Sequence, residues 1–567
     1  MTTAAPSKPS AMTRYRWIIC GLLFFSTTVN YLDRQVISYL KEFFCTPVGE
    51  GGFGWTNSDY ANVTTVFTAF YATMTILAGW VIDKIGTKLG LALSLTIWSL
   101  FGIANAFVGS LTAAHMIVRS LFGIGEAGNF PASIKTVAEW FPKRERALAT
   151  GIFNSGSNVG AMIAALFVPW CLIHYGDQLG WKMAFIITGA VGFIWLFFWF
   201  WLYAPPAQQK RLSREEYDYI HSDHDETREQ ELHEDKSGKK ASAALLSFCG
   251  RMSRAGFVGV TCMVIFLCLF FYFISTMFPG LSRNGALALY GSIGAVALWV
   301  SLAAQARRWH DLGKSGWLVL LNLVPGLGTL ASLLFLSLRN GAEGTNTHGD
   351  QPKAGVLGYP QTWAFFFGKF LTDGIWWFYL FWLPDYLKKQ FGMTKHEVML
   401  PTFIVYGVAI VGSIYGGSIP LTLMKRGMSA YRARMTAMFL IALCPLTVLT
   451  TQYFANVNHF GNLASTFAIS IICIGAAAHQ AWSANLFTTV SDMFPKKSVG
   501  SVTGIGAMAG GLGGVIILKL SGTLTDAYKA NPQHAYFIMF VICALSYLTA
   551  WCIMKTLVPR HKPITDL

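Results

Sequence analysis

Charged side chains stand inside long apolar runs at several places in this sequence. Asp33 and Arg34 lie near the end of the first run. Arg119 and Glu126 share a later run, and Lys369 lies in a third. A charge at the centre of a bilayer costs about 2.5–3.5 kcal/mol on insertion scales, so such residues are candidates for function. Carboxylates beside permanently charged arginines suit an anion site coupled to the movement of protons.

The carboxylates and the basic groups can be given separate roles. Asp33 and Glu126 are candidate proton carriers, because burial and a nearby arginine pull the protonation of a carboxyl group in opposite directions. Arg34 and Arg119 are candidate anion ligands, and an ion-pair network between the two helices is the alternative. Arg119 and Glu126 are seven residues apart, so they share a helix face about 10.5 Å apart along its axis. Lys369 could meet the other end of an anionic substrate or extend to the membrane surface.

Aromatic and amide residues in neighbouring runs could complete a site for a polyol. Polyols need partners that both donate and accept hydrogen bonds. The face of Trp376 could pack on a sugar ring, although an interfacial aromatic belt would also place it there. Some of the polar residues would instead only join helices. The further candidate ligands are Tyr71, Asn158, Tyr379, His479, Gln480 and Asn485.

The elements that carry these residues are predicted transmembrane helices. The chain is 53% hydrophobic and 13% charged, whereas a soluble domain carries about 25% charged residues. A spanning helix needs about 20 apolar residues. The first predicted spans are about 16–38, 60–82, 88–109, 112–134, 147–172 and 181–203. The second set is about 360–387, 398–423, 433–453, 462–486, 498–522 and 534–557.

The basic residues predict the orientation of these spans. The net charge of +15 arises mainly from Lys and Arg in the short loops of one side. Cytoplasmic loops of membrane proteins are enriched in these residues, and this explains the charge better than nucleic-acid binding does. Six loop or terminal segments agree if both termini are cytoplasmic, and only the loop with Lys388, Lys389 and Lys395 disagrees. We therefore expect a multi-pass protein of the cell inner membrane, functional as a monomer.

An internal repeat and a loop motif indicate the type of membrane protein. Residues 137–152 (VAEWFPKRERALATGI) match residues 490–505 (VSDMFPKKSVGSVTGI) without gaps. Two parallel six-helix repeats are the build of one large transporter fold. The run 79–88 (GWVIDKIGTK) resembles the loop signature of the major facilitator superfamily, in which Asp83 and Lys84 would act in gating.

Longer motifs resemble the anion:cation symporter family, and among its members the bacterial hexuronate transporters. The motifs are NYLDR at 30–34, Arg119 to Glu126, AEWFPKRERALATGIFNSGSNVG at 138–160, GKFLTD at 368–373, WWFYLFWLP at 376–384 and AHQAWSANLF at 478–487. The resemblance implies proton-driven import of galacturonate or glucuronate by alternating access. It would make Asp33 and Glu126 the proton carriers, with Arg34, Tyr71 and Arg119 in the substrate site.

A segment between the two predicted bundles does not resemble a transporter. Its run 307–317 (RRWHDLGKSGW) contains Gly-Lys-Ser without the other features of a phosphate loop. The segment resembles a small bacterial membrane-protein family of unknown function. Two spans are predicted at about 256–278 and 285–304, followed by a basic loop. A third run, 316–338, is broken at residues 325–328 and is predicted to be a re-entrant or interfacial hairpin.

The sequence thus predicts an all-α membrane transporter of twelve helices, six in each half, with an inserted membrane subdomain. The predicted parts are a cytoplasmic N-terminus 1–15, a bundle 16–205, a charged cytoplasmic linker 206–246, the insert 247–353, a second bundle 354–558 and a tail 559–567. Expected partners are a small anionic sugar acid, protons and lipid. We see no metal cluster, nucleophile triad or cofactor loop, so no enzyme and no cofactor is predicted. Alternatives are a carrier of another sugar acid or organic anion, and a nutrient sensor.

Overall fold

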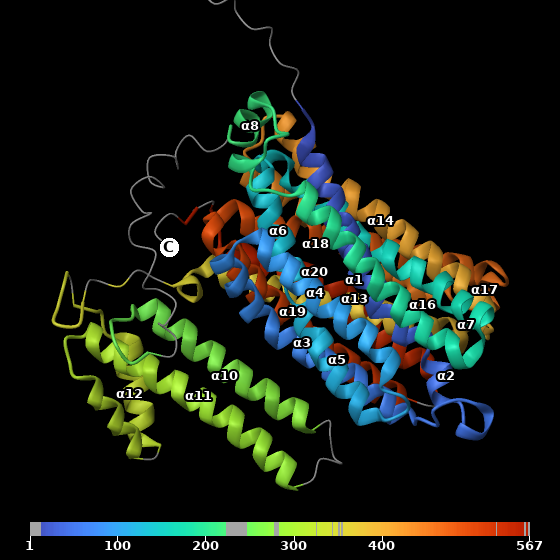
Figure 1. Cartoon of the computed structure of the whole chain (residues 1–567), viewed down its shortest axis with the longest axis horizontal. Coiled ribbons are helices and arrows are strands. Elements are labelled where there is room, and N and C mark those ends of the chain that lie inside the picture. Colours follow the sequence, from blue (N-terminus) through green and yellow to red (C-terminus); the bar gives the residue numbers. More distant parts are fainter. Residues whose placement is uncertain are drawn as a thin grey trace, which may run out of the picture. The chain divides into compact units, whose positions relative to one another are not determined.

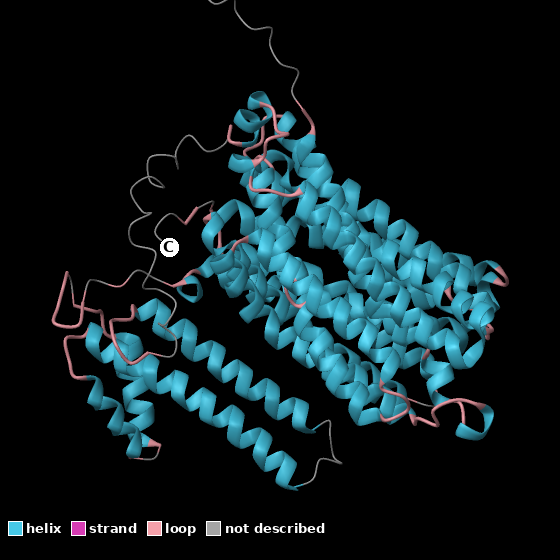
Figure 2. Cartoon of the chain, viewed as in Figure 1, coloured by secondary structure: helices cyan, strands magenta, loops and turns pink. Residues whose placement is uncertain are grey.

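The computed structural model describes residues 13–222, 247–276, 283–324, 326–342, 344–349, 352, 355–528, 530–560, 563 and 564. Within these ranges the chain is helical and contains no β-strand (Figure 2). It forms two compact units. The larger unit comprises Met1–Asp223 and Ala364–Pro563, and the smaller comprises His224–Trp363 with Ile564–Leu567.

The first half of the larger unit contains six membrane-length helical segments in the described residues. They come from α1 (Tyr15–Tyr39), α3 (Asn57–Ile85), α4 (Thr87–Ala104), α5 (Thr112–Glu126), α6 (Asn129–Trp140) and α7 (Lys143–Leu202). A short break at 127–128 separates α5 from α6, which together make one segment. α7 supplies two segments, because its backbone leaves the helical conformation at Gly176 (φ 72°, ψ 163°).

The second half follows the smaller unit in the sequence, and its helices are coloured from yellow to red in Figure 1. Its helices are α13 (Pro360–Phe391), α14 (Lys395–Lys425), α15 (Ala430–Leu443), η6 (Cys444–Thr450), α16 (Thr451–Phe454), α17 (Val457–Phe460), α18 (Leu463–Met493), η7 (Lys496–Ser498), α19 (Val499–Ala527) and α20 (Pro532–Leu557). α15, η6 and α16 follow one another and make one segment. Six segments therefore lie in each half.

Hydropathy agrees with a membrane location for this bundle. Eight helical segments within the described residues are long and apolar enough to span a membrane, and they contain α3, α4, α7, α14, α15, α18, α19 and α20. The remaining segments, α1, α5 with α6, and α13, contain the charged residues that the sequence singled out. The predicted all-α membrane architecture is confirmed.

The two halves pack closely where α3 lies along α19. Gly79, the first residue of the loop motif, faces the backbone of Gly500. A Cβ atom added at Gly79 would lie 2.2 Å from the carbonyl oxygen of Gly500, so only glycine permits this approach. The sequence motif therefore serves helix packing between the halves.

The first part of the predicted charged linker is folded against α1. η3 (Pro206–Gln208) and α8 (Arg214–Ile220) follow α7. Glu216 is buried and accepts hydrogen bonds from the backbone amides of Tyr15 (2.8 Å) and Arg16 (3.2 Å). The Arg16 guanidinium also lies 2.7 Å from Glu216. A carboxylate in this position stabilises the start of a helix. Residues 223–246 of the linker lie outside the described residues.

The smaller unit contains α10 (Arg254–Thr276), α11 (Arg283–Asp311), η4 (Gly316–Leu323), α12 (Leu327–Leu338) and η5 (Val356–Gly358). Its core consists of buried Phe257, Val260, Ala304, Trp309 and Leu336. The run 316–338 is broken as expected, with Gly326 at φ 77° and ψ −73°. Residue 325 lies outside the described residues.

One expectation for the smaller unit was wrong. The basic run from Arg307, predicted to be a loop after residue 304, continues α11 to Asp311. The physical reason is a buried ionic cluster. Asp311 lies 2.9 Å from Arg251 and also pairs with Arg308. Arg251 donates in addition to the carbonyl groups of Ala342 and Gly349, so the two ends of the unit are held together.

Small α2 (Lys41–Cys45), η1 (Val48–Glu50) and η2 (Asn105–Phe107) complete the described helices. They cover the end of the first half opposite to the start of α1. Phe43 and Phe44 of α2 and Ala106 of η2 join a core cluster with Trp55 and Trp181. This packing closes the first half at the predicted outer end.

Candidate functional site

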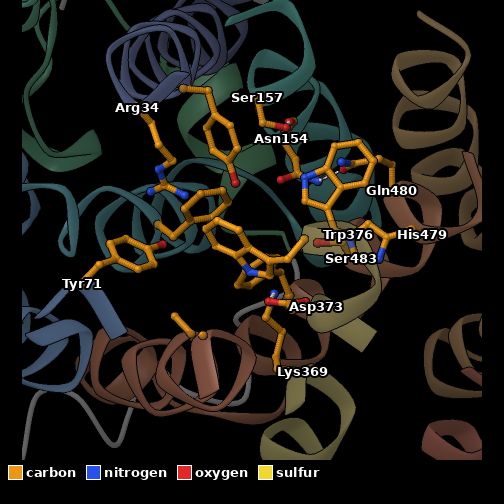
Figure 3. Close-up of a pocket in the computed structure, with 16 residues that line it drawn as sticks. Arg34, Tyr71, Asn154, Ser157, Lys369, Asp373, Trp376, His479, Gln480 and Ser483 are labelled. Atoms are coloured by element: carbon orange, nitrogen blue, oxygen red, sulfur yellow. Dashed lines mark hydrogen bonds and ion pairs between the residues drawn. The ribbon is translucent and has the colours of Figure 1, made fainter. Parts of the chain in front are cut away.

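A cavity lies between the two halves of the larger unit (Figure 3). α1, α3, α6 and α7 contribute from the first half, and α13, α18 and α19 from the second. The lining residues are Tyr31, Arg34, Tyr71, Phe130, Asn154, Ser157, Lys369, Asp373, Trp376, Trp377, His479, Gln480, Ser483, Phe487, Ala507 and Gly511. The mixture of two basic groups, aromatic rings and amide or hydroxyl groups suits an anionic, hydroxyl-rich solute.

Arg34 is the basic group of the first half. Its guanidinium Nε and Nη2 lie 2.9 Å and 2.8 Å from the Glu126 carboxylate, whose side chain is fully buried. The rings of Tyr31 and Tyr71 lie 4.7 Å and 4.6 Å from the guanidinium carbon, and Trp377 of the second half lies 5.8 Å away. Glu126 thus holds one edge of a planar fork that aromatic rings position from several sides.

Lys369 is the basic group of the second half. Its Nζ lies 2.6 Å from Asp373 Oδ2, one helical turn further along α13. The same ammonium lies 4.1 Å from the ring centre of Phe487 on α18. The ion pair and the ring hold Lys369 in the cavity, although its side chain could have extended to the membrane surface.

α18 presents a polar edge to the cavity. The ring of His479 stacks on Trp376 at 5.3 Å and shares a 2.8 Å hydrogen bond with the Tyr547 hydroxyl. Gln480 accepts a hydrogen bond of 2.8 Å from the Asn154 amide of α7. That bond joins the two halves across the cavity, so it can form only when α7 and α18 lie close together.

The halves also meet at the end where α1 begins and α20 ends, which is the predicted cytoplasmic end. Asp83 accepts hydrogen bonds from the amides of Gly500 (3.2 Å) and Ser501 (2.7 Å), and from the Ser501 hydroxyl (2.6 Å). Its first-half partner is Lys135, at 2.9 Å. Lys84, the other predicted gating residue, is exposed. Asp83 therefore bridges the halves, with Lys135 as its basic partner.

The two copies of the internal repeat meet at the same end. Arg146 of the first copy donates to the backbone carbonyl of Ser491 in the second. Asp492, the next residue, lies 3.9 Å from Arg146 and 2.6 Å from Arg434 of α15. The repeat thus supplies a second set of contacts that close this end of the bundle.

Aromatic rings close the cavity toward that end. Phe130 of α6 stacks on Phe487 of α18, with ring centres 5.5 Å apart and planes at 17°. The ring of Phe365 of α13 lies tilted at 56° to that of Phe487, with ring centres 5.9 Å apart. An apolar layer of this kind separates the polar cavity from the ionic contacts at the end.

Six of the predicted ligands lie together around the cavity: Arg34, Tyr71, Lys369, Trp376, His479 and Gln480. They come from four helices that are far apart in the sequence. A transporter whose two halves move around a central site needs ligands from both halves, and these residues supply them.

The other predicted site residues lie outside the lining. Arg119 packs between the rings of Phe122 (4.9 Å) and Phe185 (5.2 Å) inside the first half. Asp33 is buried beside Trp98 and Thr188, away from Arg34 although the two are adjacent in sequence. Successive residues of a helix point about 100° apart, which explains the separation.

Three more candidates lie among helices. Asn158 is buried on α7, and its amide has no partner among the described residues. Asn485 donates to the carbonyl groups of Gly416 (2.8 Å) and Ala481 (2.9 Å), so it joins α18 to α14. Tyr379 is buried between α13 and α18 beside Gly475. None of these three residues lines the cavity.

Some lining residues were not selected from the sequence. Tyr31 belongs to the same motif as Arg34, three residues earlier, and a helical wheel would have placed both on one face. Asp373 was visible as a charge in an apolar run, like Lys369. Phe130 and Phe487 gave no signal, because aromatic residues are common throughout the spans. Among the described residues, no cluster of three His, Cys, Asp or Glu side chains could hold a metal ion.

Comparison with known families agrees with this architecture. The sequence profile described as Major Facilitator Superfamily matches residues 23–344, 272–518 and 365–566. The hexuronate transporter of Escherichia coli (strain K12) is 25% identical over 554 residues, which cover 97% of this chain and 96% of that protein. The galacturonate transporter of Dickeya chrysanthemi is 35% identical over 205 residues, 36% of this chain and 56% of that protein.

Further relatives and solved structures extend the comparison. The D-galactonate transporter of Escherichia coli O6:H1 is 24% identical over 540 residues, covering 94% of this chain and 95% of that protein. A structure of the proton:xylose symporter XylE superposes with a TM-score of 0.57 at 13% identity, covering 95% of each chain. At that identity the likeness shows the fold alone.

Proposed function

The chain belongs to the Major Facilitator Superfamily and is a transporter, not an enzyme; from this premise we propose that it is a proton-coupled symporter that imports sugar acids. We propose hexuronates such as galacturonate and glucuronate as its substrates. The names of the relatives support a sugar acid as cargo. The cavity supports it independently, because two basic groups lie among rings and groups that bind hydroxyls.

The contact between Arg34 and Glu126 carries the proposal. A carboxylate on Arg34 neutralises the group that would bind the substrate, at 2.8–2.9 Å in a buried place. When Glu126 takes a proton from the outside, Arg34 is released to bind the carboxylate of the substrate. When substrate leaves at the inside, Glu126 gives up the proton and pairs with Arg34 again. Proton and anion are thereby carried in the same direction.

Asp33 and Arg119 would support this exchange from inside the first half. Both are buried, and Arg119 lies within electrostatic reach of Asp33 and Glu126. We propose that Asp33 is the second proton carrier of this network. Since Arg119 lies outside the cavity lining, it would hold the charge balance of the carboxylates and not contact substrate directly.

Alternating access would proceed by opening and closing the two ends of the bundle. Release of Asp83 from Gly500 and Ser501 and separation of Phe130 from Phe487 would open the predicted cytoplasmic end. The Asn154–Gln480 bond would break in the same step, since it also joins the halves. We propose an inner-membrane monomer with both termini in the cytoplasm.

The test is uptake of labelled galacturonate and glucuronate into proteoliposomes, with and without an inward proton gradient. Wild-type protein should accumulate substrate only with the gradient. Glu126→Gln should lose gradient-driven accumulation and keep exchange of labelled for unlabelled substrate, because exchange needs no net proton movement. If folded wild-type protein takes up neither hexuronate, hexuronate transport is rejected as the function.

A second candidate substrate class is favoured by the relatives themselves. D-galactonate and galactarate/D-glucarate transporters also align over most of the chain, at 24% identity. These acids differ from hexuronates at one end of the same carbon chain. The same liposomes, tested with each acid in turn, distinguish the candidates.

A further inference from the structure

The two basic groups of the cavity are neutralised in different ways. Glu126 approaches Arg34 from the interior of the first half and does not line the cavity. Asp373 pairs with Lys369 at 2.6 Å, and both of these side chains line the cavity. Among the described lining residues Asp373 is the one carboxylate, so a bound solute meets it directly.

The position of Asp373 is built into the packing of α13 against α19. A Cβ atom added at Gly510 would lie 2.2 Å from Asp373 Oδ2. Because position 510 is glycine, the carboxylate fits against the backbone of α19 and still reaches Lys369 one turn away. Lys369, Asp373 and Trp377 are spaced by four residues, so they form one face of α13 toward the cavity.

The two ends of the cavity therefore differ in what they offer a carboxylate. Arg34 pairs with Glu126 through Nε and Nη2, and in the proposed cycle protonation of Glu126 releases this planar fork to bind the substrate carboxylate. Lys369 is a point charge already paired at 2.6 Å, with a ring on its other side. Figure 3 shows Arg34 and Lys369 approaching the cavity from different sides. A carboxylate is favoured at Arg34 and opposed by Asp373 at Lys369.

We propose that Asp373 is a specificity-determining residue that restricts the cavity to sugar acids with a single carboxylate. The inference rests on the proposed sugar-acid transport. The uncharged end of the substrate lies at the Lys369–Asp373 pair, where the carboxylate accepts hydrogen bonds from hydroxyls. A second carboxylate at that end meets Asp373 as a like charge with no free cation, which is unfavourable in a buried site.

The test compares two six-carbon acids that differ at one end, where galacturonate has an aldehyde carbon that closes into a ring and galactarate has a second carboxylate. Galacturonate carries one carboxylate, and galactarate carries two on the same carbon skeleton. Inhibition of labelled galacturonate uptake by each unlabelled acid is measured at neutral pH in proteoliposomes containing the full chain. For wild type, galactarate should inhibit at least about tenfold more weakly than galacturonate. In Asp373→Asn the half-inhibiting concentration of galactarate should fall about tenfold or more, because Lys369 is now free.

Further variants identify the cause. Lys369→Gln combined with Asp373→Asn removes both charges, so galactarate should inhibit no better than in wild type. Asp385→Asn is the matched control, because Asp385 pairs with Lys389 at 2.8 Å on the same helix, with the same spacing, outside the lining. It should leave the ratio of the two acids unchanged. Asp373→Ser removes the same charge if the Asn variant does not fold.

The outcomes separate the two proposals. A ratio that stays the same in an Asp373 variant that still transports galacturonate overturns the charge restriction and leaves sugar-acid transport standing. The same holds if wild type accepts galactarate as well as galacturonate. Absence of uptake of every sugar acid by folded wild type overturns the proposed function, and this inference with it.

Discussion

Arg34 contacts both a carboxylate and aromatic rings, and lysine cannot reproduce these contacts. The guanidinium holds Glu126 through two nitrogens and lies among the rings of Tyr31 and Tyr71. A lysine ammonium lacks the planar fork, so it would bind the substrate carboxylate through a single nitrogen once Glu126 is protonated. We expect Arg34→Lys to raise the KM for a hexuronate at least about tenfold, equivalent to about 1.4 kcal/mol.

Concentration-dependent uptake in proteoliposomes measures this effect. Arg426→Lys is the control, because Arg426 is exposed at the end of α14, away from the cavity. It should leave the KM unchanged. A lysine at position 34 that supports wild-type affinity would show that a single positive charge is enough, and would remove the argument from the fork.

At the residue scale, the sequence predicted which groups are chemically unusual but not which way they point. Arg34 and Lys369 were found as charges in apolar runs, and both line the cavity. The same signal selected Arg119, which packs on Phe122 and Phe185 inside the first half. Charge in a span shows that a partner is needed. It does not distinguish a partner in the protein from one in a ligand, because the rotation of each helix is set by packing.

At the scale of elements, α8 is the least expected feature of the larger unit. The sequence places these residues in a predicted charged linker. In the structure Glu216 is buried, accepts hydrogen bonds from two backbone amides at the start of α1 and pairs with the Arg16 guanidinium. The Tyr219 hydroxyl of α8 also donates a 2.6 Å hydrogen bond to Glu145 at the start of α7. α8 therefore ties the ends of two helices that belong to different spans.

Removing the charge of Glu216 should loosen this tie. Glu216→Gln keeps the shape and loses the charge-assisted bonds, which contribute about 1.5–3 kcal/mol when made to charged groups. We expect a lower midpoint of thermal unfolding for the purified protein in detergent, followed by tryptophan fluorescence. Asp218→Asn, an exposed carboxylate on the same helix, should leave the midpoint unchanged. Equal midpoints for both variants would mean that α8 does not stabilise α1.

Short-range patterns could not have predicted such a contact. The residues of α8 are about 200 positions away from those of α1 that they bind. The sequence shows only a polar stretch after a span, and polar stretches in loops are usually solvated. The basic end of α11 was misjudged for the same reason, because the Asp311 carboxylate pairs with Arg308 and with the distant Arg251 inside the smaller unit.

At the scale of the whole molecule, hydropathy and the internal repeat were sufficient for the fold. Six membrane-length segments in each half follow from the length and polarity of the runs. The repeat predicted that equivalent loops are related, and in the structure Arg146 of one copy contacts Ser491 of the other. Membrane-spanning helices can be predicted without knowledge of tertiary contacts, because each helix must satisfy the hydrogen bonds of its own backbone in lipid.

The smaller unit gives the last prediction, that transport does not need it. Arg251 near its beginning donates to the carbonyl groups of Ala342 and Gly349 near its end, and Asp311 anchors Arg251. Ends held together in this way allow a unit to be inserted into a connection between two helices without separating them. We expect a protein in which residues 247–353 are replaced by a short Gly/Ser linker to keep uptake within about twofold of wild type. The larger unit is compact without these residues and has a core of its own.

Uptake and gradient dependence of the shortened protein are measured beside wild type, with equal amounts of protein confirmed in the liposomes. Asp311→Asn in the full chain is the companion variant, because it breaks the tie between the ends without shortening the chain. It should lower the stability of the smaller unit and leave uptake unchanged. Loss of transport in the shortened protein, with correct insertion and monodispersity, would show instead that the smaller unit takes part in the transport cycle.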